Sequence, residues 1–94
     1  MSKQKIYSVI RETMEDSALK LKVYPCESMD ALRKQMEMLK DEINKKGYFK
    51  GFKNNTSEYV IEDFINRDNP SFYIASTTDD YYEMLHTQVS QLFI

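Results

Sequence analysis

The chain has 94 residues, of which 41% are hydrophobic and 30% charged, and its formal net charge is −2. This length allows one domain with one modest core and excludes a second domain or a deep enclosed cavity. The composition is that of a folded chain, and no run of eighteen apolar residues or apolar leader occurs. We therefore expect a single domain over residues 1–94, a cytoplasmic location and no membrane partner.

The charge is unevenly distributed along the chain. Residues 1–53 carry twelve Lys or Arg against eight acids, whereas residues 54–94 carry only Arg67 against seven acids. The first part is therefore net basic and the second net acidic. Such a division influences which partners the surfaces attract rather than which fold forms.

The first predicted elements form a hairpin. Residues 5–14 also fit a helical stripe, but the run Ile-Tyr-Ser-Val-Ile favours a strand that turns around residues 15–17. In the segment that follows, apolar side chains alternate with longer polar ones: Leu19, Leu21 and Val23 with Lys20, Lys22 and Tyr24. This alternation predicts a half-buried strand that ends at Pro25.

The clearest element is a helix over residues 28–46. Its apolar residues recur every three or four positions, at Met29, Leu32, Met36, Leu39 and Ile43. Ser28 suits the N-cap and Gly47 the left-handed stop. A homodimeric coiled coil through this stripe would need more than three heptads, so we expect the stripe to face the core.

Lysines and aromatic residues interleave directly after this helix, in segment 45–53. Lysines can hold phosphates while rings stack on bases, so these residues form a candidate nucleic-acid site. Its members are Lys46, Tyr48, Phe49, Lys50, Phe52 and Lys53. The alternative is a helix end followed by a short strand whose rings pack in the core.

The rest of the chain predicts a second hairpin and one undecided element. Residues 59–65 and 71–75 are rich in β-branched and aromatic residues, with a turn at residues 68–70, although 57–66 also fits a helix. Residues 79–94 fit either a helix or a strand. We therefore expect a small α+β domain, an antiparallel sheet with the helix packed on it, in the order ββαββ plus a final strand or helix.

Few residues are suited to catalysis or to metal binding. The chain has one cysteine, Cys26, and one histidine, His86, which do not make a metal-ligand set, and no phosphate-binding glycine motif occurs. A Cys26–His86 nucleophile and base pair is conceivable, but no third group is identified to orient it. We expect no metal, no cofactor and no enzyme activity, with a small enzyme of unfamiliar design as an alternative.

These observations favour a non-catalytic protein-binding module. One concrete version is a phage or mobile-element inhibitor or adaptor whose acidic surface docks on a basic nucleic-acid-binding protein. The candidate partner-binding residues come from the acidic part of the chain and from its neighbouring rings. They are Glu62, Asp63, Asp79, Asp80, Tyr81, Tyr82 and Glu83. A homodimer and a nucleic-acid-binding module are the alternatives.

Overall fold

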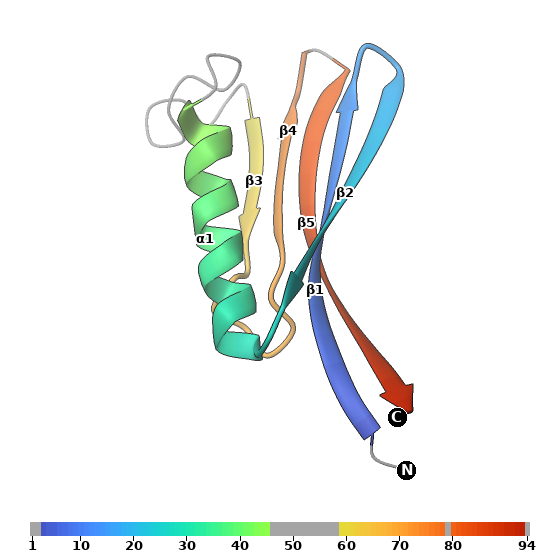
Figure 1. Cartoon of the computed structure of the whole chain (residues 1–94). Coiled ribbons are helices and arrows are strands. Elements are labelled where there is room, and N and C mark those ends of the chain that lie inside the picture. Colours follow the sequence, from blue (N-terminus) through green and yellow to red (C-terminus); the bar gives the residue numbers. More distant parts are fainter. Residues whose placement is uncertain (1–2, 46–58, 79, 94) are drawn as a thin grey trace.

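The computed structural model describes residues 3–45, 59–78 and 80–93, which form five strands and one helix (Figure 1). In chain order these are β1 (Lys3–Glu15), β2 (Ala18–Cys26), α1 (Met29–Lys45), β3 (Tyr59–Asp63), β4 (Phe72–Ser76) and β5 (Tyr81–Phe93). The predicted α+β fold, with one helix packed on an antiparallel sheet, is confirmed. No helix among these residues has the length and apolar content needed to cross a membrane.

The five strands form one antiparallel sheet in the order β2-β1-β5-β4-β3. Strands β1 and β5 lie side by side along their whole length, from Lys3 opposite Phe93 to Glu15 opposite Tyr81. The helical alternatives for residues 5–14, 57–66 and 79–94 are therefore wrong wherever these residues are described. These segments are strands because they pair with segments far apart in the chain, and their local sequence patterns do not reveal that pairing.

The first hairpin turns on two residues with positive φ. Asp16 has φ of 50° and Ser17 of 64°, as expected for the two central residues of a tight hairpin turn that matches the twist of the strands. The turn lies at the predicted position. Neither residue is glycine, so the backbone is held in a region that costs an L-residue about 1 kcal/mol or more.

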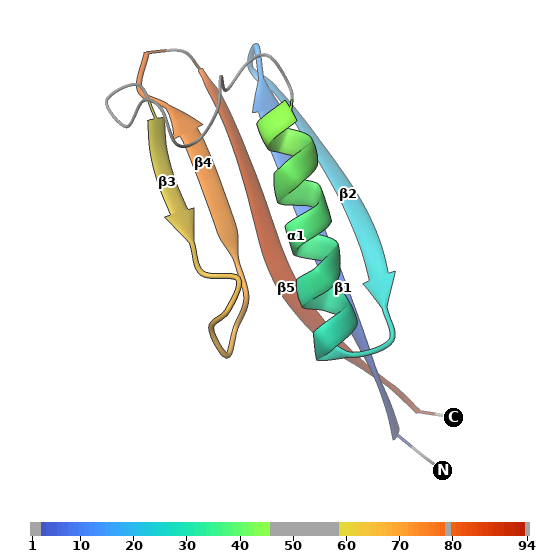
Figure 2. The same cartoon turned by 90° about the vertical axis from the view of Figure 1, so that its left-hand side faces the viewer.

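The helix covers one face of the sheet and supplies much of the core (Figure 2). The Ser28 hydroxyl accepts a hydrogen bond of 3.1 Å from the Ala31 N–H, which confirms the predicted N-cap. The helix stripe buries four of its predicted members against residues of β1, β4 and β5 and of the β3–β4 connection. The buried apolar side chains are Val9, Leu32, Met36, Leu39, Ile43, Ile65, Phe72, Ile74, Tyr81 and Leu85.

Strand β2 presents its apolar side chains to the face of the sheet opposite the helix. Leu19, Leu21 and Val23 are 53%, 62% and 55% exposed. The expected half-buried strand is therefore corrected. Side chains alternate across a sheet, and Lys20, Lys22 and Tyr24 take the helix side because they lie in register with the helix-facing positions of β1, such as Arg11 opposite Lys22.

The positive-φ turn predicts a way to stabilise the domain. Ser17→Gly should raise the free energy of unfolding by about 0.5–1 kcal/mol, because glycine adopts this region without a steric cost and loses only part of that gain through its flexible unfolded state. The matched variant Ser17→Val should lower it by about 1 kcal/mol or more, because a β-branched side chain is disfavoured at positive φ. Urea unfolding measures both, and equal stability of the two variants would contradict the turn assignment.

Candidate functional site

The sheet has an inner face under the helix and an outer face that no described element covers (Figure 1). We define the outer face from the strand register, because directly paired residues point to the same side. Its central members are Leu19, Leu21 and Val23 on β2, Ile10, Glu12 and Met14 on β1, Tyr82, Met84 and His86 on β5, Tyr73 and Ala75 on β4, and Val60 and Glu62 on β3. Most are apolar or aromatic.

The polar residues at the middle of the outer face bind one another. The Tyr82 hydroxyl donates a hydrogen bond to the Glu12 carboxylate, and His86 Nε2 lies 3.7 Å from Glu12 Oε1. The hydrogen bond to Glu12 raises the pKa of Tyr82, with a smaller effect from burial. The rings of Tyr73 and Tyr82 are 6.0 Å apart, centroid to centroid. The face is therefore an apolar surface with its central carboxylate already hydrogen-bonded.

The predicted acidic partner-binding residues do not share one surface. Tyr82 and Glu62 lie on the outer face, whereas Asp80 is exposed in the β4–β5 connection and accepts a 3.4 Å hydrogen bond from Ser17. The inner face holds Asp63, Tyr81 and Glu83. Asp79 lies outside the described residues, as do the candidate nucleic-acid residues Lys46, Tyr48, Phe49, Lys50, Phe52 and Lys53, so those interpretations stay predictions.

Glu83 and Tyr81 are buried, which corrects the expectation of a continuous exposed acidic surface. Glu83 is 0% exposed and Tyr81 5% exposed. Arg11 donates to Glu83 Oε1 from Nε at 2.8 Å and from Nη2 at 2.5 Å, and Thr13 donates to the same oxygen at 3.0 Å. The Tyr81 hydroxyl donates to Oε2 at 3.0 Å. Both carboxylate oxygens of this buried acid are therefore satisfied.

Cations from the basic part of the chain neutralise two of the acids. Arg11 and Glu83 are 72 residues apart in sequence. Burial alone would lower the pKa of Arg11, but the hydrogen bonds and negative charge of Glu83 outweigh burial, so the pKa is raised. Lys40 on the helix likewise lies 2.5 Å from Asp63, and this bond raises the pKa of Lys40. The sequence offered no signal for either partner, since both pairs join distant segments.

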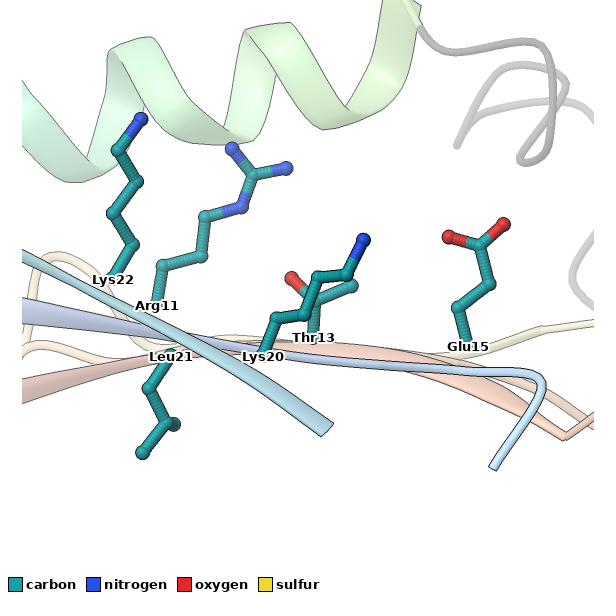
Figure 3. Close-up of a pocket in the computed structure, with 6 residues that line it drawn as sticks. All are labelled: Arg11, Thr13, Glu15, Lys20, Leu21 and Lys22. Atoms are coloured by element: carbon teal, nitrogen blue, oxygen red, sulfur yellow. The ribbon is translucent and has the colours of Figure 1, made fainter. Parts of the chain in front are cut away.

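A charged cleft opens between the helix and the first hairpin (Figure 3). Its volume is about 480 Å³, and it is lined by Arg11, Thr13, Glu15, Lys20, Leu21 and Lys22. Leu21 points away from the helix, whereas the other five project toward the helix side of the sheet.

The charges around this cleft balance one another. Lys20 and Lys22 form no ion pair with any residue that the structure describes. Lys22 Nζ lies 5.4 Å from the centre of the Tyr24 ring. The two lysine charges are offset by Glu15 and by Glu42, whose Oε1 is 3.3 Å from Arg11 Nη1. The described residues therefore give the cleft no net charge that favours an anion or a cation.

Cys26 and His86 lie on opposite faces of the sheet. Cys26 pairs with Tyr7 on the inner face, whereas His86 contacts Glu12 on the outer face. The conceivable nucleophile and base pair is therefore corrected, because the sheet separates the two side chains. Burial raises the pKa of the Cys26 thiol, which disfavours the reactive thiolate. Within residues 3–45, 59–78 and 80–93, no cluster of three or more metal-ligating side chains occurs.

The buried ion pair predicts that replacing one partner alone destabilises the domain more than replacing both. Arg11→Met should lower the free energy of unfolding by about 3–5 kcal/mol, because it leaves the Glu83 charge buried without a partner. The double variant Arg11→Met/Glu83→Gln should recover about 2 kcal/mol of this loss by removing that charge. Arg33→Met is the control, since Arg33 makes exposed contacts with Asp30 at 3.8 Å and with the Arg67 carbonyl at 3.1 Å, and an exposed ion pair contributes about 1 kcal/mol at most. Urea unfolding that shows no recovery in the double variant would contradict this account.

Tyr81 predicts a loss of stability at alkaline pH. Burial, followed by the charge and hydrogen bond of Glu83, raises the pKa of Tyr81 above its ordinary value. The folded state thus favours the neutral phenol, so this contribution is present below about pH 10 and is lost as the pH rises further. Tyr81→Phe should flatten the decline in unfolding free energy between about pH 9 and pH 11, whereas Tyr73→Phe on the outer face should retain it. An unchanged slope in Tyr81→Phe would refute this role.

Two candidate surfaces thus emerge from the described residues. The outer face is apolar and no described element covers it, whereas the cleft of about 480 Å³ is balanced in charge among the described residues. Comparison of the chain with known protein families, with characterised proteins and with solved structures gives no match.

Proposed function

We propose that this chain is a non-catalytic protein-binding module and that the outer face of its sheet is the binding surface. The observation that supports this most is the exposure of Leu19, Leu21 and Val23, three consecutive apolar positions on one side of β2. Contiguous exposed apolar surface of this kind commonly marks an interaction site. Strand β2 therefore places its apolar side chains on a face that does not contribute to the described core.

The size of the outer face is compatible with this role. Strands lie about 4.8 Å apart and rise about 3.4 Å per residue, so the paired region of the sheet presents an area on the order of 500 Å². The largest patch on a typical monomer is about 300–600 Å², and such patches are often functional. Tyr73, Tyr82 and Met84 at its middle are residue types that are enriched in interface cores.

Charge indicates what kind of surface the partner presents. The only charged side chains that the register assigns to the outer face are Glu12, Glu62 and, when protonated, His86, and Asp80 is exposed beside it. A partner with an apolar patch bordered by Lys or Arg would complement both features. In this proposal the exposed acids Glu62 and Asp80 border an apolar contact, and the buried Glu83 and Tyr81 take no part in docking. A basic nucleic-acid-binding protein is one partner of this kind, and an inhibitor or adaptor of phage or mobile-element origin is one setting for it.

The binding role predicts that charge on the outer face abolishes association. A photo-reactive residue at Leu21 should cross-link a partner in the native host, and that partner, once purified, should bind the chain directly. Leu19→Lys/Leu21→Lys should weaken this binding at least about 100-fold, because two lysine charges would be placed against an apolar contact. Met38→Lys, at an exposed helix residue, is the matched control and should leave the affinity unchanged.

Two outcomes would contradict the proposal. One is a purified partner whose affinity is unaffected by Leu19→Lys/Leu21→Lys, with folding of the variant verified by thermal melt. The other is equal cross-linking from Leu21 and from Met38.

Charge reversal at Glu62 and Asp80 should act mainly on the association rate and lose its effect at high salt, because these acids lie at or beyond the border of the apolar contact.

A further inference from the structure

The end of β5 has an open edge. Strand β4 pairs with β5 only from Tyr82 to Leu85, and the Thr87 hydroxyl then donates a 2.6 Å hydrogen bond to the Pro70 carbonyl. On the other side, β1 continues to pair with β5 as far as Phe93. From residue 88 to residue 93, no described strand lies beside β5 where β4 would continue. Alternate backbone N–H and C=O groups of this stretch therefore point to a side that no described strand occupies.

The open stretch also projects beyond the rest of the domain. Figures 1 and 2 show β1 and β5 continuing as a two-stranded ribbon past the start of α1 and past the connection between β3 and β4. Both described chain ends lie at the tip of this ribbon. A second molecule can therefore approach the edge of β5 without meeting the helix.

The other open edges carry features that discourage pairing, and this edge carries none. Strand β2 has Lys20 and Lys22 and also Pro25, which has no N–H to donate. The free end of β1 has Lys3 and Lys5, and the short β3 has Glu62 and Asp63. Charges, proline and short length are the usual protection of sheet edges against other chains. Residues 88–93 read Gln-Val-Ser-Gln-Leu-Phe, without a charge or a proline.

We propose that the open edge of β5, residues 88–93, pairs with the same edge of a second copy of this chain. The two β5 strands would run antiparallel about a two-fold axis and join two five-stranded sheets into one. In such a contact the residues near the axis meet their own counterparts and those at one end of the strand meet those at the other, so like charges within this short strand would lie in one contact and repel one another. The absence of any charge over these six residues removes that repulsion. A different partner protein would impose no such condition on the strand.

The contact is small, which sets the expected affinity. Six residues of strand span about 20 Å. A single added strand pair buries less surface than the roughly 1,200 Å² at the low end of stable interfaces. We therefore expect a dimer with a dissociation constant in the range of about 1–100 µM.

The test is the molar mass in solution as a function of concentration. Light scattering coupled to gel filtration, from about 1 to 500 µM, should show the mass rising from 11.2 kDa toward twice that value. Gln88→Lys/Ser90→Lys, at two exposed positions, should hold the mass at that of one chain throughout, because the pairing would bring four lysines together. Leu19→Lys/Leu21→Lys adds the same charge to β2 and should still dimerise.

A second measurement identifies the edge directly. In a Cys26→Ser background, single cysteines at Gln88, Val89 and Ser90 should form disulfide-linked dimers on mild oxidation at the positions nearest the two-fold axis. A cysteine at Leu21 should not. Cross-linking at one of the three β5 positions together with loss of the dimer in Gln88→Lys/Ser90→Lys would support the proposal.

Three results would overturn it. The first is a single-chain mass at every concentration. The second is a dimer that Gln88→Lys/Ser90→Lys leaves intact. The third is a dimer lost only in Leu19→Lys/Leu21→Lys, which would place the contact on the outer face. Binding of another protein to the outer face is tested by a different pair of residues, so either proposal can fail while the other stands.

Discussion

The buried contact between Arg11 and Glu83 constrains much of the rest of the structure. It joins β1 to β5 at the centre of the sheet, and Arg11 also reaches Glu42 on the helix. A slip of one residue between β1 and β5 would turn one of the two charges to the outer face and leave the other buried alone. Such an arrangement would cost several kcal/mol, so this pair disfavours alternative registers of the two longest strands.

That register also determines the character of the two faces. With Arg11 under the helix, its neighbour Lys22 must share the inner face, and Leu19, Leu21 and Val23 must take the outer one. The apolar outer face therefore follows from the same alternation that buries Val9 and Leu85. The feature that supports a binding role and the feature that stabilises the core are two consequences of one strand register.

The two proposals combine in a simple geometry. A two-fold axis between antiparallel β5 strands runs perpendicular to the sheet, so both outer faces of the dimer lie on the same side and both helices on the other. The dimer would then present two binding surfaces next to each other. A partner with two matching sites, or two partners that themselves associate, would bind it more tightly than a single copy through the increase in local concentration.

The sequence predicted elements better than it predicted their surroundings. The helix, its Ser28 cap, the turn at residues 15–17 and both hairpins follow from local periodicity and turn chemistry, and the structure confirms them. The strand β5 could not be chosen over a helix, because Leu85 and Val89 satisfy both periods and the decision comes from pairing with β1. The burial of Glu83 was not predictable for a similar reason, since its partner Arg11 lies in the opposite end of the chain.

The position of the apolar outer face could not be predicted from the local sequence either. Alternation in residues 19–24 predicts that one side of the strand is apolar, but it does not say which side the helix covers. Lys20 and Lys22 extend toward the helix side beside the charged cleft, where long side chains can keep their ammonium groups in solvent while their methylene groups cover the sheet. The side that these two lysines take follows from the register between β1 and β2, in which Lys22 lies opposite the buried Arg11.

The long pairing of β1 with β5 has a consequence for how the chain folds. The first and last described strands are neighbours at the centre of the sheet, so the largest closed loop in the domain spans nearly its whole length. Contacts between such distant segments form late and slowly, because the entropy of closing the loop must be overcome first. Until β5 is synthesised, the hairpin of β1 and β2 lacks its central neighbour and Arg11 lacks its carboxylate. The domain should therefore acquire its native core only after β5 has left the ribosome.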